Sequence, residues 1–138
     1  MISEPYRILI ALAARGDEKP VIDQAIFFKE KMNARLTVIH INQPALSQPK
    51  GEVLQNVTKK KLENIFIKYG YEKVISEIKF VIEYGENISD IIKNYSDKIN
   101  LIILGHRKMS TFKSHIMDSV DEGISNLISC PVLIVQKS

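Results

Sequence analysis

The sequence contains one cysteine, Cys130, and no tryptophan. A single cysteine excludes a disulfide framework within the chain and is typical of a protein from a reducing compartment. Residues 1–5 show no basic segment followed by an apolar stretch, and no apolar run approaches the roughly 20 residues of a membrane-spanning helix. The sequence therefore predicts a soluble cytoplasmic protein with no signal peptide and no membrane contact.

The chain also has no large excess of either sign of charge, because 19 basic and 16 acidic side chains leave a net charge of only +3. Such a small net charge does not by itself indicate a nucleic-acid partner. The run of three lysines at 59–61 spans most of a helical turn and is typical of a solvated helix face. Since the chain has no basic stripe with interleaved aromatic residues, we expect that it does not bind nucleic acid.

The motifs of several common reactions are missing. The chain has no G-x-S-x-G, no H-E-x-x-H, no P-loop lysine motif and no C-x-x-C. The three histidines show no metal-ligand spacing, and Cys130 has no partner cysteine. We therefore expect no metal site and no enzymatic activity, and we expect His40 to be a hydrogen-bonded histidine of the core or of a strand end.

Apolar strands and helices alternate along the 138 residues. Val74 to Tyr84 is predicted to be a strand at or near a sheet edge, because its apolar and charged residues alternate. The other strands are predicted at 8–14, 36–41, 101–104 and 131–135. Apolar stripes predict helices over 20–32, 54–69, 88–95 and 120–128. This order predicts one α/β domain over residues 1–138, with a five-stranded parallel sheet covered by helices on both faces.

The fourth strand ends in Gly105 and is followed by a basic loop. This loop contains Arg107, Lys108 and Lys113, with histidines at 106 and 115. One interpretation is a site for an anion or a polyphosphate, and the other is a solvated loop that happens to be charged. The residues alone leave both open.

Four segments, in order and at their separations, resemble the universal stress protein family, and the resemblance covers nearly the whole chain. They are RILIAL at 7–12, LTVIHI at 36–41, IILGHR at 102–107 and SCPVLIV at 129–135. The resemblance implies a doubly wound sheet with strand order 3-2-1-4-5. It also implies that the last strand forms the second edge, where family members often pair two subunits.

In a doubly wound sheet, ligands bind at the carboxyl ends of the strands where the strand order reverses. The implied order places this point between the first and fourth strands. The candidate site is then formed by Ala13 to Asp17, the residues that follow Ile41, and the loop after Gly105.

The ATP-binding branch of the family has the motif G-x2-G-x9-G-[ST] and an aspartate after the first strand. Gly105 matches the first glycine and Ser119 the hydroxyl, but Lys108 and Asp118 replace two glycines and Ala13 replaces the aspartate. Glycines permit close approach of the backbone to phosphates, so these replacements predict that ATP is not bound in the family's manner. Ser119 also begins a capping-box pattern that accounts for its hydroxyl without a ligand. The candidate nucleotide or anion site comprises Ala13, Ile41, Gly105, Arg107, Lys108, Lys113, Asp118, Ser119 and Val120.

The resemblance implies a stress-linked regulatory module with no cofactor, which pairs as a homodimer through the last strand and has an unidentified protein partner. The strand residues expected at the dimer interface are Val132, Leu133, Ile134 and Val135. The alternative is a protein that binds ATP or another adenine nucleotide weakly through its basic loop, with slow ATP hydrolysis as an open addition. A third interpretation is an enzyme of the related adenine-nucleotide α-hydrolase-like folds, but the chain lacks a catalytic set for it.

Overall fold

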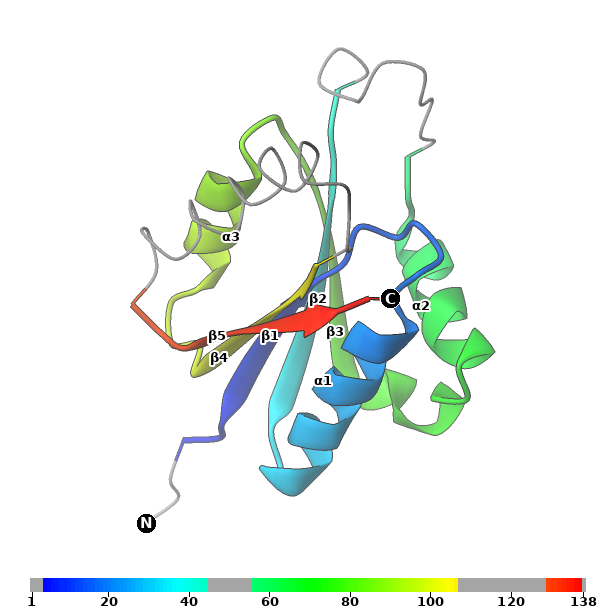
Figure 1. Cartoon of the computed structure of the whole chain (residues 1–138), viewed down its shortest axis with the longest axis vertical. Helices are drawn as coiled ribbons and strands as arrows, with labels where there is room; N and C mark the ends of the chain where they lie inside the picture. Colours follow the sequence, from blue (N-terminus) through cyan, green and yellow to red (C-terminus); the bar gives the residue numbers. More distant parts are fainter. Residues whose placement is uncertain (1–3, 45–55, 107–128, 138) are drawn as a thin grey trace.

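The computed structural model of the chain describes residues 4–44, 56–106 and 129–137. These residues form a single parallel sheet with helices on both faces (Figure 1). The strands are β1 (Arg7–Ala11), β2 (Arg35–Asn42), β3 (Ile78–Tyr84), β4 (Leu101–His106) and β5 (Val132–Gln136). The helices are α1 (Lys19–Lys31), α2 (Lys59–Lys68) and α3 (Ile88–Tyr95), and a 3-10 helix, η2 (Glu72–Glu77), precedes β3.

The strand order is β3-β2-β1-β4-β5, as the resemblance implied, and every neighbouring pair is parallel. Ile8 of β1 lies between Leu36 of β2 and Leu101 of β4. The prediction that β3 forms an edge is therefore confirmed, and β5 forms the other edge. The strand order therefore reverses between β1 and β4, which are neighbours in the sheet.

Successive residues of β1 fill two separate cores. Ile8 and Ile10 pack on the α1 and α2 side with Phe66, whereas Leu9 packs on the α3 side with Ile92. All five side chains are fully buried. The continuous apolar run in β1 is explained by burial on both faces, which is typical of a parallel sheet.

Two predicted strand boundaries are wrong. The first strand ends at Ala11 instead of residue 14, because Ala14 and Gly16 have φ values of 59° and 94° and turn the chain toward α1. The third strand begins at Ile78 instead of residue 74. Ile78 pairs with Leu36 near the start of β2, so most of the residues before Ile78 have no strand to pair with and form η2.

The predicted second helix is confirmed over α2, which begins after Thr58. The Thr58 hydroxyl accepts a hydrogen bond from the Lys61 amide at 3.2 Å, an N-cap that ends the preceding loop. Part of the apolar stripe before Thr58, including Leu54, lies outside the described residues, as does the whole predicted helix over 120–128.

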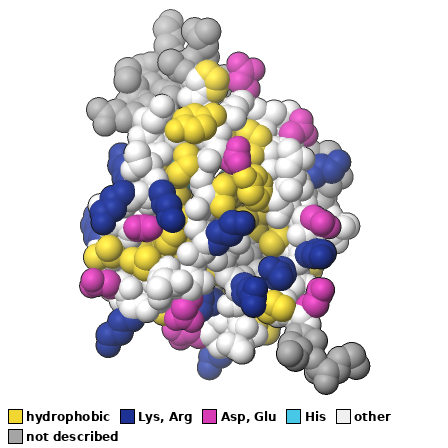
Figure 2. All heavy atoms as spheres, turned by 180° about the vertical axis from the view of Figure 1, so that it is seen from behind, with side chains coloured by type: hydrophobic (Ala, Val, Ile, Leu, Met, Phe, Trp, Pro, Cys, Tyr) yellow, Lys and Arg dark blue, Asp and Glu magenta, His cyan; other side chains and the backbone are white. Residues whose placement is uncertain are grey.

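The surface seen in Figure 2 mixes charges of both signs. The described Lys and Arg side chains on this face are interspersed with Asp and Glu, and apolar side chains lie between them. None of the helices that the structure describes is long and apolar enough to cross a bilayer.

Candidate functional site

The candidate site lies at the carboxyl ends of β1 and β4. These strands are neighbours, with Ala11 opposite Leu104 in the register. The segment that follows β1, residues 12–18, is called the β1–α1 loop below. It passes close to the end of β5 (Figure 1), so parts of the chain more than a hundred residues apart meet here.

A buried carboxylate, that of Glu18, holds the β1–α1 loop. Its Oε2 accepts a hydrogen bond from the Arg15 amide at 2.9 Å, and its Oε1 accepts one from the Gly16 amide at 2.8 Å. Glu18 is fully buried. Burial, followed by a hydrogen bond with Asp17, raises the pKa of the Glu18 carboxyl, while the two amides and Lys137 act in the opposite direction. The loop is thus closed by a side chain at the start of α1.

The side chain of Lys137, which follows β5, contacts the carboxylates of the β1–α1 loop. Its Nζ lies 3.2 Å from Asp17 Oδ1 and 3.8 Å from Glu18 Oε2, and the side chain is only 9% exposed. Its backbone amide donates a hydrogen bond to the His106 carbonyl oxygen at 2.9 Å, which extends the β4–β5 ladder by one residue. Lys137 therefore joins the edge strand to the β1–α1 loop.

Gly105 has a packing role at the end of β4. A Cβ added to this glycine would lie 2.5 Å from Lys137 Cε and 2.7 Å from Val21 Cγ2. Real side chains essentially never approach so closely, so these two side chains occupy the space that any larger residue would need. The packing of Val21 and Lys137 therefore favours a glycine at this position, whether or not a phosphate is bound.

The start of the β1–α1 loop provides no acidic group. Ala13 is exposed at the position of the family's aspartate, and Ala14 adopts a left-handed φ of 59°. A left-handed backbone is unfavourable for a residue that has a Cβ. The carboxylates of the loop come later, at Asp17 and Glu18, where Lys137 pairs with them.

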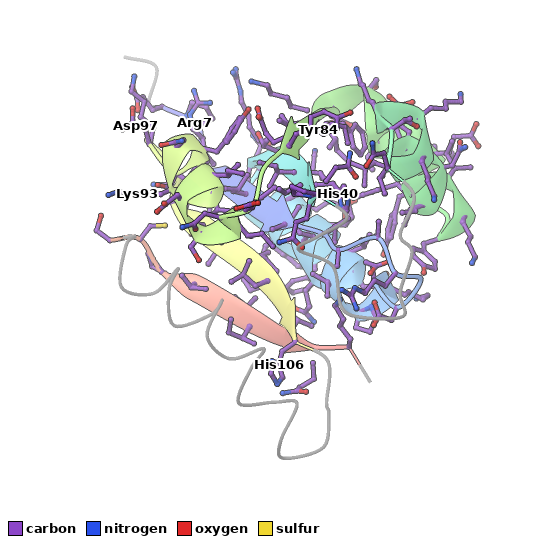
Figure 3. All side chains as sticks on the ribbon, turned by 90° about the horizontal axis from the view of Figure 1, so that it is seen from above. Arg7, His40, Tyr84, Lys93, Asp97 and His106 are labelled. Atoms are coloured by element: carbon purple, nitrogen blue, oxygen red, sulfur yellow. The ribbon has the colours of Figure 1, made fainter. Side chains whose placement is uncertain are left out.

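His40 is a hydrogen-bonded histidine near the end of β2, as expected. Its Nδ1 lies 2.7 Å from the Leu12 carbonyl oxygen, and its Nε2 lies 3.1 Å from Asn42 Oδ1. The Asn42 side chain binds both backbone groups of Val57, accepting from its amide at 2.8 Å and donating to its carbonyl oxygen at 2.9 Å. In Figure 3, His40 lies in the interior and His106 at the end of β4. The His40 ring, the Asn42 side chain and the Val57 backbone, all buried, thus connect the ends of β1 and β2 to the chain before α2.

The structure brings part of the predicted site together. Ala13 and Gly105 lie at the ends of neighbouring strands, whereas Ile41 packs on the α3 side of the sheet. In residues 4–44, 56–106 and 129–137, no three His, Cys, Asp or Glu side chains are placed to hold a metal ion. The remaining site residues predicted from the sequence lie outside the described part of the chain: Arg107, Lys108, Lys113, Asp118, Ser119 and Val120.

Two polar residues of the site were not predicted, Glu18 and Lys137, whereas Asn42 is the first of the residues after Ile41 that the sequence placed there. A signal existed for Lys137, because the carboxyl ends of parallel strands meet at one side of a sheet and Lys137 directly follows the last strand. Glu18 precedes a helix whose second residue is proline, which marks it as a helix-start position. Nothing in the sequence indicates that Glu18 folds back onto the loop before it.

Within the described ranges 4–44, 56–106 and 129–137, no strand pairs with the outer edge of β5. Pro131 O accepts from Ile102 N and Lys137 N donates to His106 O, so the backbone groups of residues 131, 133, 135 and 137 point toward β4. Those of Val132, Ile134 and Gln136 point toward the open edge. The side chains of Leu133 and Val135 pack on the α1 side of the core, and Ile134 is 40% exposed.

Cys130, just before β5, is a free and half-buried cysteine. Burial raises the pKa of its thiol. A raised pKa lowers the thiolate fraction, and this environment is not that of a reactive cysteine.

The model of the universal stress protein family matches residues 6–136. Universal stress protein YxiE of Bacillus subtilis (strain 168) is 27% identical over 147 residues, which cover 94% of this chain and 98% of that protein. A crystal structure of a universal stress protein in complex with cAMP has a TM-score of 0.68 and 18% identity over 99% of this chain and 100% of the other. The universal stress protein of Archaeoglobus fulgidus in complex with dAMP has a TM-score of 0.54 and 16% identity, over 98% and 99%.

The packing at Gly105 predicts a steric cost for a side chain there. We expect Gly105→Ala to lower the free energy of unfolding by about 1–3 kcal/mol, because the new methyl group meets Val21 and Lys137. In a Val21→Ala background the further cost of Gly105→Ala should be smaller by about 0.5 kcal/mol or more. Urea unfolding of the four proteins measures both values. Equal costs in the two backgrounds would contradict the packing explanation.

The left-handed conformation of Ala14 predicts a stabilising substitution. Glycine adopts this conformation without a Cβ clash, so Ala14→Gly should raise the free energy of unfolding by about 0.5–1 kcal/mol after the entropy loss of glycine is included. The neighbouring Ala13→Gly is the control and should be neutral or destabilising, since Ala13 has no left-handed φ to relieve. Equal effects of the two glycines in urea unfolding would show that Ala14 is not strained.

Proposed function

Because the chain belongs to the universal stress protein family, we propose that it acts as a stress-linked regulatory module of the cytoplasm that catalyses no reaction and does not bind ATP in the family's manner. The observation that carries this proposal is the packing at Gly105. The space beside the first glycine of the ATP-binding motif is occupied by Lys137 and Val21.

The charges around Gly105 support the same proposal. The Lys137 ammonium, whose side chain packs beside Gly105, is paired with the carboxyls of Asp17 and Glu18. An ammonium paired with carboxylates attracts a triphosphate less than an unpaired one would. Lys108 and Asp118 replace two glycines of the motif, and Ala13 replaces the aspartate after the first strand.

A second candidate is binding of an adenine nucleotide through the basic loop. Two of the structurally similar universal stress proteins were solved with cAMP and dAMP, each of which carries a single phosphate. A single phosphate needs fewer backbone contacts than a triphosphate, and Arg107, Lys108 and Lys113 could supply charge in place of glycines. Slow hydrolysis of ATP would be an addition to this candidate.

We expect the unmodified protein to bind ATP with a dissociation constant above about 100 μM, which corresponds to less than roughly 5.5 kcal/mol of binding free energy. Calorimetric titration with ATP, and with AMP and cAMP in parallel, measures this. Low-micromolar binding of ATP would contradict the first proposal. Low-micromolar binding of AMP or cAMP alone would favour the second candidate.

Substitutions in the loop separate the two candidates further. If the missing glycines are the main defect, Lys108→Gly combined with Asp118→Gly should strengthen ATP binding. If the loop binds phosphate by charge, Lys108→Gly alone should weaken it, as removing a charged hydrogen bond does. Lys93→Ala, on an exposed position of α3, is the control for loss of one positive charge.

We also propose that the protein forms a homodimer through β5. An edge strand with free backbone groups favours pairing with another chain. A two-fold axis would pair β5 antiparallel with its copy and close the assembly at two subunits. Val132, Ile134 and Gln136 would provide the intersubunit backbone hydrogen bonds, because their backbone groups point away from β4.

A proline scan of β5 tests this pairing. Ile134→Pro removes an outward donor and should shift the dimer to monomer with little loss of stability, because the ladder to β4 is kept. Val135→Pro is the matched control: it removes an inward donor and should lower the free energy of unfolding by about 3 kcal/mol or more. Sedimentation measures the first effect and urea unfolding the second. A wild-type protein that remains a monomer at high concentration would refute the assembly.

A further inference from the structure

We propose that Lys137 is a positioning residue that holds the β1–α1 loop in its shape and couples this loop of the candidate site to the outer edge of β5. The first part depends only on contacts within one chain. The coupling rests on the proposed pairing of two copies through β5.

The contacts of Lys137 span two parts of the fold. Its amide completes the ladder between β5 and β4, its stem fills the space beside Gly105, and its ammonium lies 3.2 Å from Asp17 Oδ1. The side chain is 9% exposed, so its charge interacts with these carboxylates largely out of water, where the interaction is stronger than at the surface. One residue therefore fixes the end of an edge strand and the loop that follows the central strand.

The β1–α1 loop depends on such side-chain contacts for its shape. Its backbone is left-handed at Ala14 and Gly16, a conformation that persists when surrounding contacts hold it. The carboxylate of Glu18 supplies these contacts by accepting the amides of Arg15 and Gly16. A fully buried carboxylate is stabilised by a nearby positive charge, which Lys137 provides at 3.8 Å. Loss of that charge should loosen the hold of Glu18 on the two amides.

The coupling to the edge follows from the position of Lys137 next to Gln136. The backbone groups of Gln136 point toward the open edge, where a second copy would bind them. Pairing would restrain β5 up to the residue before Lys137 and so restrain the place of its ammonium. A ligand that reshapes the β1–α1 loop would act on β5 through the same contact, since coupling between two sites is reciprocal.

The loop-holding role is tested in the full chain with Lys137→Met, which keeps most of the apolar stem and removes the charge. Lys19→Met is the matched control. Lys19 lies at the start of α1, pairs with Asp23 at 2.7 Å and is 60% exposed, so its loss removes one positive charge and breaks an ion pair within the helix. The readout is hydrogen exchange of the Arg15 and Gly16 amides, compared with the core amides of Leu9 and Ile10.

We expect the Arg15 and Gly16 amides to exchange about tenfold faster or more in Lys137→Met, with core amides and Lys19→Met unchanged. Wild-type rates at Arg15 and Gly16 in Lys137→Met would overturn the proposal. Equal acceleration of loop and core amides would also overturn it, because Lys137 would then contribute only to global stability.

The coupling is tested by measuring the same two amides over a range of protein concentrations, with sedimentation reporting the dimer. We expect exchange at Arg15 and Gly16 to slow as the wild-type dimer forms, and not to respond in Ile134→Pro or in Lys137→Met. A dimer that forms without changing these rates would refute the coupling and leave the assembly standing. A wild-type monomer at every concentration would refute the assembly and the coupling, while the comparison of Lys137→Met with wild type would still decide the loop-holding role.

Discussion

The burial of β1 on both faces is the constraint on which the rest of the fold depends. Ile8, Leu9 and Ile10 are fully buried, and β1 pairs with β2 on one side and β4 on the other. A strand in this position needs helices on both faces of the sheet. With strand order β3-β2-β1-β4-β5, the point where the order reverses lies between β1 and β4, and this point is where the candidate site lies. The place of the site follows from the packing of three apolar side chains.

The sequence predicts those features that arise from local periodicity. The alternation of apolar residues with Lys79 and Glu83 identified β3 as an edge strand, and the apolar run of β1 identified a buried one. The errors have non-local causes: η2 replaces the start of the predicted third strand because β2 offers no partner there. The polar contacts of the site have the same character. Glu18 and Lys137 are 119 positions apart in the chain, and only the folded sheet places their side chains within 3.8 Å.

Gly105 shows why a matching motif residue needs a physical explanation before it is used as evidence for a ligand. A glycine at the end of β4 fits the first position of a phosphate-binding motif, and it equally fits a place where Val21 and Lys137 leave no room for a Cβ. Packing against Val21 and Lys137 is a property of this chain alone and requires no ligand. His40 is a similar case, because its two ring nitrogens contact Leu12 and Asn42. At both positions the folded chain supplies a reason for the residue that is independent of any bound molecule.

The candidate site and the edge of the sheet share one residue, Lys137. Lys137 contacts the β1–α1 loop through its side chain and β4 through its backbone. In a five-stranded sheet of this order, only β4 separates the central strand β1 from the edge strand β5. A side chain at the end of β5 can therefore reach across β4 where β4 carries a glycine, since a larger residue at position 105 would block its path. Gly105, which matches the first glycine of a phosphate-binding motif, thus also leaves room for the Lys137 side chain to reach the β1–α1 loop.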